Sequence, residues 1–252
     1  MSKKNPILCC ILDGLGIGIG SDSFYAPYRA QFSTTTVNAS GEAVGLLPGM
    51  VGNSMAGHLT LGSGRIIFQP ITVLTNELRT GSIPQGEYIP RLNKPLHIIA
   101  LLSPSGVHGS LEILYRMLTL LQQHTEQDIL IHALLDGRDA PPYAGYGYLE
   151  ELAAYCAQHP RCALASVAGR FYALDRDNHV ERTAEYCALF THKTDIENWQ
   201  NLIRRAYDQK VSDEYITPFR TAEFTIQPDD CILILITRAD RARSLVRTLQ
   251  QK

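Results

Sequence analysis

Apolar residues form four short, nearly uninterrupted runs along the chain, and a fifth run is weaker. The runs cover residues 7–12, 96–102, 129–135 and 231–236, and the weaker one covers residues 162–167. They are too short and too uniformly apolar to be amphipathic helices, which keep a polar face. We therefore predict buried strands of the kind found in parallel sheets that are covered on both faces.

Between these runs, apolar residues recur with helical spacing. Three such faces are Leu111, Leu114, Tyr115 and Leu118; Leu149, Leu152, Ala153 and Cys156; and Ala242, Leu245, Val246 and Leu249. Because strands and helices alternate, we predict the α/β fold class, with a mostly parallel sheet and flanking helices. Residues 13–65 differ, since they hold eleven of the 19 glycines and read as a loop-rich region in which sites tend to be built.

The charge balance and the length of the apolar runs exclude some partners. With 23 Lys+Arg against 25 Asp+Glu, the formal net charge of −2 argues against a nucleic-acid partner held by its phosphates. The run at residues 7–12 is too short for a membrane span or a secretory signal, so we expect no membrane partner and a cytoplasmic protein. The six cysteines include no CxxC pair, which favours free thiols over disulfides or zinc.

Arginine outnumbers lysine by 17 to 6, and charged residues follow the predicted strands. These residues are His108, then Arg138 with Asp139, then Arg170 with Arg176, and finally Arg238 with Arg241. Parallel sheets bind ligands outside the carboxyl ends of their strands, so these side chains would gather at one edge. Such a cluster suits a small ligand with both phosphate and carboxylate groups. The alternative is that each arginine forms a surface ion pair with a neighbouring aspartate, which contributes little to stability.

Two further residues could carry chemistry, and each has a structural alternative. Asp13 follows the first predicted strand, where an aspartate is either a metal ligand or a turn residue that bonds its own backbone. Ser54 lies between glycines before a predicted helix, where it is either a nucleophile or a helix cap. The glycines nearby miss the dinucleotide-binding spacing, and Ser54 misses the spacing of an acyl-transfer nucleophile elbow.

Several motifs occur in the order found in the cofactor-independent phosphoglycerate mutases of the alkaline phosphatase superfamily. They are SGEAVG, GNSMAGHLTLGSGR, SGVH, DGRDAPP, VAGRFYALDRD and RADRAR. The chain resembles the N-terminal half of that family, from Asp13 to Arg243. The resemblance implies that residues 1–72 form the first part of an incomplete alkaline-phosphatase-like α/β portion. It implies that residues 73–252 form a C-terminally truncated phosphotransferase domain that binds the substrate.

The resemblance also implies roles for individual residues. Ser54 resembles the serine that takes the phosphoryl group from 3-phosphoglycerate, and Asp13 and Ser54 resemble ligands in a site of two Mn²⁺ ions. Asp139 resembles the acid/base for the glycerate hydroxyls. The residues that resemble the phosphoglycerate clamp are His108, Arg138, Arg170, Arg176, Arg238 and Arg241. The implied reaction returns the phosphoryl group from phosphoserine to the other hydroxyl, which gives 2-phosphoglycerate.

The chain departs from the family pattern in ways that bear on activity. Eleven residues follow Arg241 and the last histidine is His192, so the Asp-x-x-x-His and Asp-His metal ligands of the family have no counterpart here. The partner histidine that the family has two places after His108 is replaced by Ser110. We expect one half of a split mutase, inactive as an isolated chain and completed by a second polypeptide. The alternative is an incompetent remnant or module that binds phosphoglycerate, or a similar phosphorylated hydroxy acid, without turning it over.

Overall fold

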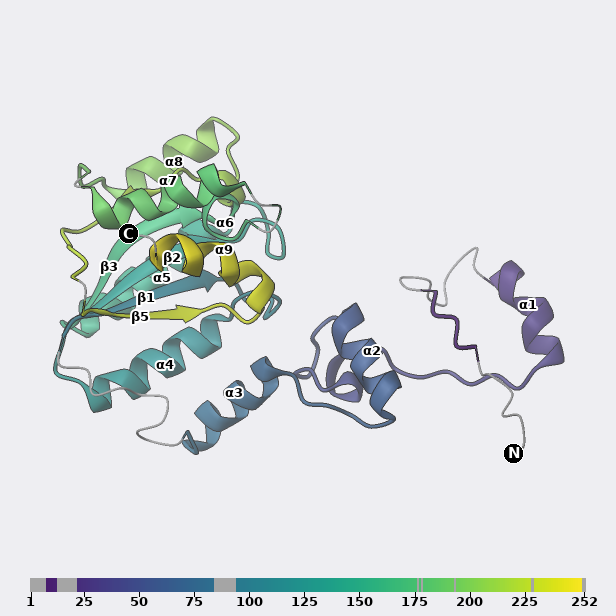
Figure 1. Ribbon diagram of the computed structural model, residues 1–252. Coiled ribbons are helices and arrows are strands. Elements are labelled where there is room, and N and C mark those ends of the chain that lie inside the picture. The colour runs from purple at the N-terminus through teal and green to yellow at the C-terminus, as the bar shows by residue number, and fades with distance from the viewer. Residues whose placement is uncertain are drawn as a thin grey trace. The chain divides into compact units, whose positions relative to one another are not determined.

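The computed structural model describes residues 8–12, 22–83, 94–175, 177, 179–192, 194–227 and 229–250. The chain divides into two compact units, Met1–Gln69 and Pro70–Lys252, and Figure 1 shows the helices and strands of both. None of the helices in the described ranges has the length and hydropathy needed to cross a bilayer.

Unit 2, Pro70–Lys252, is built on a five-stranded sheet in the order β4-β3-β2-β1-β5. The strands are β1 (Leu96–Leu102), β2 (Ile129–Leu135), β3 (Cys162–Gly169), β4 (Phe219–Arg220) and β5 (Cys231–Leu235). All run parallel except β4, which is antiparallel to β3. The first residues of β1, β2 and β5 are aligned with one another in the register. The carboxyl ends of these parallel strands therefore lie together at one edge of the sheet, the carboxyl edge. The predicted α/β fold with a mostly parallel sheet is confirmed.

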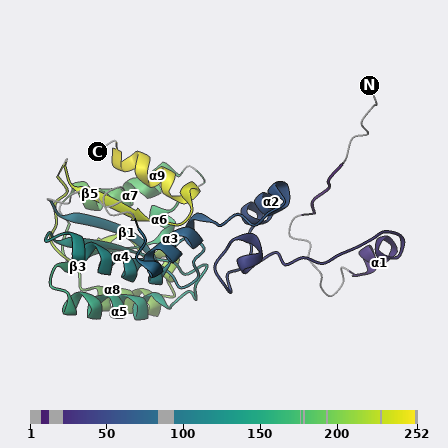
Figure 2. The same ribbon diagram turned by 90° about the horizontal axis from the view of Figure 1, so that it is seen from below.

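Helices cover both faces of this sheet. They are α3 (Pro70–Thr80), α4 (Leu111–His124), α5 (Gly145–Gln158), α6 (Arg170–Ala173), α7 (Val180–Thr191), α8 (Trp199–Asp208), α9 (Ala239–Gln250) and the 3-10 helix η2 (Asp213–Tyr215). Figure 2 shows α5 and α8 on one side of the sheet and α7 and α9 on the other. Two hydrophobic cores result. Ile98 packs in one of them with Leu149 of α5, and Ile99 packs in the other with Leu245 of α9. Successive strand residues thus fill opposite cores.

The predicted elements of unit 2 agree closely with those observed. β1 and β2 have the predicted bounds, β3 extends two residues further, and β5 ends one residue earlier. The three predicted apolar faces lie on α4, α5 and α9. We did not predict β4, whose two residues are too few to produce an alternating pattern, nor α3, α7 and α8.

Unit 1, Met1–Gln69, contains α1 (Asp22–Gln31), the 3-10 helix η1 (Gly41–Val44) and α2 (Ser54–Ser63). The strand predicted over residues 7–12 is wrong for residues 8–12, which form no strand and are exposed, with Leu8 at 93%. An apolar run becomes a strand only where a neighbouring strand takes up its backbone hydrogen bonds. Among the described strands, none pairs with these residues. Ile7 lies outside the described residues.

A chain of buried polar side chains crosses the sheet from β3 to the start of β5. His132 Nδ1 lies 2.8 Å from the Ser166 hydroxyl, and His132 Nε2 lies 2.9 Å from His97 Nδ1. His97 Nε2 lies 3.7 Å from Oδ2 of Asp230. A carboxylate can only accept hydrogen bonds. Asp230 therefore favours the tautomer of His97 that carries its proton on Nε2, the nitrogen that faces Asp230. His132 then donates to His97, and Ser166 donates to His132.

Acid is expected to destabilise unit 2 through these histidines. Burial lowers the pKa of His97, and burial with the charges of His97 and Arg220 lowers the pKa of His132 well below its ordinary value of 6.5. Below pH 6.5 the unfolded chain therefore binds more protons than the fold. The unfolding free energy then falls by up to about 1.4 kcal/mol per pH unit for each histidine.

Urea unfolding at about pH 7 and about pH 5.5 measures this effect, followed by the fluorescence of the single tryptophan, Trp199. A His124→Gln variant, altered at an exposed position of α4, should keep the full pH dependence. Equal stability of the unaltered chain at the two pH values would contradict the expectation.

Candidate functional site

The structure places the predicted charged residues of unit 2 at the carboxyl edge of the sheet. They are His108 between β1 and α4, Arg138 and Asp139 after β2, Arg170 after β3, and Arg238 and Arg241 around the start of α9. Two of these loops are hydrogen-bonded to each other. The backbone N–H of Thr237 donates to the carbonyl of His108 at 3.0 Å, and its hydroxyl donates to the carbonyl of Val107 at 3.0 Å. The loop before α9 is thus held against the loop that carries His108.

Arg170 is the central residue of the cluster. Its side chain is 3% exposed, and Nη1 donates to Oδ1 of Asp136 at 2.5 Å and to Oδ2 of Asp139 at 2.6 Å. Oδ1 of Asp136 also accepts from the backbone N–H groups of Arg138 and Asp139, at 3.3 and 3.1 Å. A buried guanidinium without partners would cost several kcal/mol, so the two carboxylates allow Arg170 to lie inside the protein.

Sequence reasoning missed Asp136. A signal was present, since this aspartate directly follows a buried strand and begins the segment Asp-Gly-Arg-Asp. From that position a carboxylate caps the backbone N–H groups two and three residues further along. The pairing with Arg170 was not readable, because 34 residues separate the two along the chain.

Asp139 lies between Arg170 and His108, and its Oδ2 is 3.7 Å from Nε2 of His108. Burial raises the pKa of Asp139, but the hydrogen bond and charge of Arg170 outweigh burial, and the charges of His108 and Arg138 add to them. The net result is a pKa below the ordinary value. Asp139 is therefore ionised at neutral pH.

His108 is buried beside several cations. Burial, followed by the charges of Arg170 and Arg241, lowers the pKa of His108 to about 4; Asp139 opposes the shift and Arg238 adds to it. His108 is therefore a neutral imidazole at pH 7, with one nitrogen that donates and one that accepts. Its buried Nδ1 has no hydrogen-bond partner among the described residues. Contacts bring these loops together, because Asp139 contacts both Arg170 and His108, and the loop before α9 is hydrogen-bonded to the loop that carries His108.

The surface-pair alternative describes two of the arginines. Arg238 Nε lies 3.3 Å from Oδ1 of Asp240, with both side chains more than a third exposed. Arg138 Nη1 lies 3.6 Å from Oε1 of Glu214, and the Arg138 side chain is 59% exposed. Exposed pairs of this kind contribute little, so an incoming anion could replace these carboxylates at low cost. Arg170 is different, because its two partners are part of the interior.

Arg238 and Arg241 lie at the amino end of α9, where the helix dipole disfavours cations. Asp240, between them, has the favoured charge for that position. Arg241 also donates from Nη1 to the carbonyl of Leu174 at 3.2 Å, which ties α9 to the segment after α6. Helix stability therefore does not explain an arginine directly before α9 and another in its first turn.

Two glycines allow the segment at residues 213–214 to approach the strand ends. Gly137 has a φ of +64°, and a Cβ there would lie 2.6 Å from the backbone nitrogen of Glu214. At Gly169, a Cβ would lie 2.2 Å from the Glu214 carbonyl oxygen. A side chain at either position would displace Glu214, which faces Arg138 across the mouth of the cluster.

The other predicted site residues are Asp13, Arg176 and Ser54. Asp13 and Arg176 lie outside the described residues. Ser54 belongs to unit 1, where it is the exposed first residue of α2. The cap of that helix is Asn53, whose Oδ1 accepts from the N–H of Ala56 at 3.0 Å, so Ser54 does not have the capping role that was its structural alternative.

The residues in the described ranges do not form a manganese site by themselves. Within those ranges, no three His, Cys, Asp or Glu side chains gather as metal ligands. Ser110 has a structural role. Its hydroxyl accepts from the N–H of Ile113 at 3.3 Å and caps α4.

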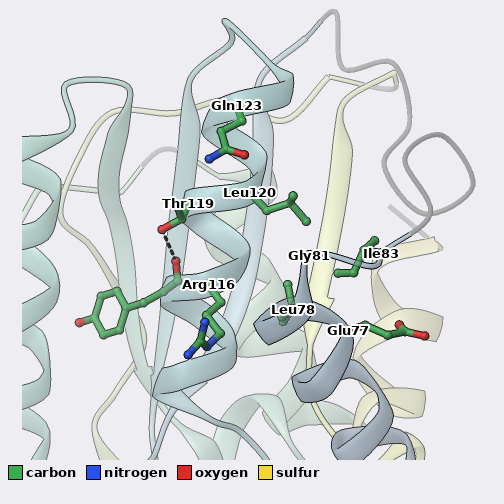
Figure 3. Close-up of a pocket in the computed structure, with 9 residues that line it drawn as sticks. Glu77, Leu78, Gly81, Ile83, Arg116, Thr119, Leu120 and Gln123 are labelled. Atoms are coloured by element: carbon green, nitrogen blue, oxygen red, sulfur yellow. Dashed lines mark hydrogen bonds between the residues drawn. The ribbon is translucent and has the colours of Figure 1, made fainter.

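A separate hollow of about 320 Å³ lies between α3 and α4 (Figure 3). Leu78, Ile83 and Leu120 line it, with Glu77 and Arg116 also at its wall. In Figure 3 the labelled side chains come from these two helices and the segment after α3. The hollow contains none of the predicted site residues and has no cluster of charges comparable to that around His108.

The Asp136→Asn variant is expected to destabilise unit 2 by about 3 kcal/mol, because it removes one of the two charges that balance buried Arg170. Asp240→Asn, which breaks an exposed pair in the same cluster, should cost about 1 kcal/mol or less. Urea unfolding of the two variants beside the unaltered chain gives both values. Similar losses of unfolding free energy in the two variants would show that the buried Asp136–Arg170 pair stabilises unit 2 no more than the exposed pair does.

Comparisons with known proteins place the chain in a family. The family described as "BPG-independent PGAM N-terminus" matches residues 85–252. The 2,3-bisphosphoglycerate-independent phosphoglycerate mutase of Moorella thermoacetica is 36% identical over 98% of this chain and 53% of its own length, and that of Clostridium beijerinckii is 33% identical over 100% and 54%. A crystal structure of Leishmania mexicana phosphoglycerate mutase at low cobalt concentration superposes with a TM-score of 0.79 at 29% identity, over 91% of this chain and 46% of that one. The chain spans about half the length of these relatives, and it belongs to the BPG-independent phosphoglycerate mutase family, whose N-terminal portion it matches.

Proposed function

We propose that this chain supplies the phosphoglycerate-binding and nucleophile-bearing half of a phosphoglycerate mutase. That enzyme interconverts 3-phosphoglycerate and 2-phosphoglycerate through a phosphoserine at Ser54. The observation that supports the proposal best is the cluster in which Asp139 contacts both Arg170 and His108, with the loop that carries Arg238 hydrogen-bonded to the loop of His108. Membership of the family, and relatives that are named as mutases, support it further.

In this proposal the phosphate and carboxylate of the substrate bind to the arginines of the carboxyl edge. Arg138, Arg238 and Arg241 bind anionic oxygens, and Arg176 joins them. Each charge-assisted hydrogen bond contributes roughly 1.5–3 kcal/mol. His108 orients the ligand through a neutral ring nitrogen, which avoids a further buried charge before the substrate arrives.

Asp139 handles the glycerate hydroxyls. In the first step the Ser54 oxygen bonds to phosphorus, the bond from phosphorus to O3 breaks, and the proton that leaves Ser54 is passed to O3. In the return step O2 bonds to phosphorus and the bond from phosphorus to the Ser54 oxygen breaks. The Asp139 carboxylate takes the proton of O2, and this proton is passed on to the Ser54 oxygen. Arg170 holds the pKa of Asp139 low. A substrate anion bound beside Asp139 would raise that pKa and make Asp139 a stronger base.

In this proposal a second polypeptide corresponds to the part of the relatives beyond the match; the chain spans 53% of the Moorella protein. That polypeptide would supply the ligands for manganese that complement Asp13 and Ser54. The described residues alone do not fit such a site. The isolated chain should therefore bind phosphoglycerate without converting it.

A second candidate function is a module that binds phosphoglycerate, or a similar phosphorylated hydroxy acid, and never turns it over. This reading is favoured because binding needs only residues that belong to unit 2. The two readings agree on binding and differ on catalysis by the assembled halves.

Binding is tested by calorimetry with 3-phosphoglycerate. The isolated chain should bind it, and Arg238→Gln should weaken binding about tenfold or more, as loss of one charge-assisted bond implies. Arg116→Gln, a matched change on the exposed surface of α4, should leave the affinity unchanged. Absence of binding by the unaltered chain, or equal weakening by both variants, would contradict the assignment of the site.

Catalysis is tested by a mutase assay with manganese on the chain alone and mixed with the part of the Moorella mutase beyond the match. We expect turnover of 3-phosphoglycerate only in the mixture, and none in the mixture when Ser54→Ala replaces the unaltered chain. Binding without turnover in the mixture would favour the module. Turnover by the unmixed chain that survives Ser54→Ala would refute the phosphoserine mechanism.

A further inference from the structure

The backbone of residues 213–216, which includes the 3-10 helix η2, is hydrogen-bonded to the ends of two strands. The N–H of Asp213 donates to the carbonyl of Pro142, in the loop after β2, at 2.8 Å. The N–H of Gly169, the last residue of β3, donates to the carbonyl of Ile216 at 2.7 Å. This segment therefore has a fixed place at the carboxyl edge, beside the loop that carries Arg138.

The side chain of Asp213 holds the same segment a second time. Asp213 is 1% exposed; its Oδ1 accepts from the Tyr207 hydroxyl at 2.5 Å, and its Oδ2 accepts from the N–H of Gly145 at 2.7 Å. A Cβ at Gly145 would lie 2.6 Å from Oδ1 of Asp213, so a glycine is needed for this close approach. Helices α5 and α8 thus both fix Asp213, through charge-assisted hydrogen bonds.

Glu214 follows Asp213 and faces Arg138, with 3.6 Å between Oε1 and Nη1. The Glu214 side chain is 16% exposed, whereas that of Arg138 is 59% exposed. Arg138 is therefore free to turn from Glu214 to a ligand, while the Glu214 carboxylate stays where its backbone holds it. Asp240, which pairs with Arg238, is 40% exposed and can turn into solvent. Of these two carboxylates, Glu214 is the less free to leave.

A carboxylate held at this place affects ligands according to their charge, because the repulsion grows in proportion to the negative charge of the ligand. Phosphoglycerate carries one phosphate and one carboxylate. A second phosphate adds a charge of about −1.5 to −2 at pH 7. That phosphate would need a cation of its own, and Glu214 offsets the charge of Arg138, the arginine that extends furthest into solvent in the described cluster.

We propose that Glu214 is a specificity-determining residue, which disfavours glycerates with a second phosphate at the carboxyl edge. Asp213 acts as the positioning residue that keeps the carboxylate in place. A fixed like charge that repels the wrong ligand more than the right one is a general route to specificity. This inference rests on the proposed function, since it takes the cluster around His108 as the site of phosphoglycerate binding.

The test is calorimetry on the full chain with 3-phosphoglycerate and, separately, with 2,3-bisphosphoglycerate. The unaltered chain should bind 3-phosphoglycerate more tightly. Glu214→Gln keeps the size of the side chain and removes its charge, so the ratio of the two dissociation constants should fall about tenfold. Glu214→Asp keeps the charge and should keep most of the preference. Retained tryptophan fluorescence of Trp199 shows that each variant is folded.

The matched control is Glu126→Gln, which breaks the pair of an exposed glutamate with Arg161 before β2, at the other end of the sheet. It should leave the ratio unchanged. An unaltered chain that binds both ligands equally, or a ratio that Glu214→Gln does not lower more than Glu126→Gln, would overturn the role of Glu214 and leave the phosphoglycerate site intact.

The failure of the proposed function gives a different result. If the unaltered chain does not bind 3-phosphoglycerate, the site assignment fails and the role of Glu214 fails with it. If the preference is present and Glu214→Gln removes it, but the mixture with the second polypeptide shows no turnover, the role of Glu214 is supported and the mutase activity is rejected.

Discussion

The buried ion pair of Arg170 with Asp136 and Asp139 is the interaction on which the carboxyl edge of unit 2 depends. A guanidinium taken out of water needs carboxylates with good geometry, and removing one of them leaves an uncompensated charge in the interior. Asp136 meets this need because it is fixed twice, by Arg170 and by the backbone N–H groups of the turn that follows β2. The same turn places Asp139, which in turn faces His108. One buried cation thus sets the geometry of three loops.

The charges of this site are largely balanced before a ligand binds. Arg170 has two carboxylate partners, and Arg138 and Arg238 each have one. The exposed pairs are weak, so the arginines at the mouth can exchange a carboxylate for a ligand anion while Arg170 keeps the frame intact. Neutral His108 adds a polar group without adding a charge. This arrangement separates the residues that hold the site together from those that would hold the ligand.

Much of unit 2 could be predicted from the sequence, and the reason is that its signals are local. Runs such as residues 96–102 and 129–135 are apolar because both faces of those strands are covered, so their bounds can be read directly. The convergence of charged loops follows from the parallel topology. Residues 8–12 show the limit of this reasoning, since an equally apolar run forms no strand without a neighbour. Asp136 shows another limit, because its role depends on Arg170, 34 residues away. The functional roles of all the predicted site residues stay predictions, and Asp13 and Arg176 also lie outside the described residues.

The central claim is that the cluster around His108 binds phosphoglycerate, and the titration of that imidazole by NMR tests it most directly. In the free chain the pKa of His108 should be about 4, because burial and the neighbouring arginines disfavour its charged form. Saturating 3-phosphoglycerate should raise the pKa, since an anion beside the ring stabilises the imidazolium and offsets the arginines. A His108 resonance that titrates at the same pH with and without 3-phosphoglycerate would contradict the claim.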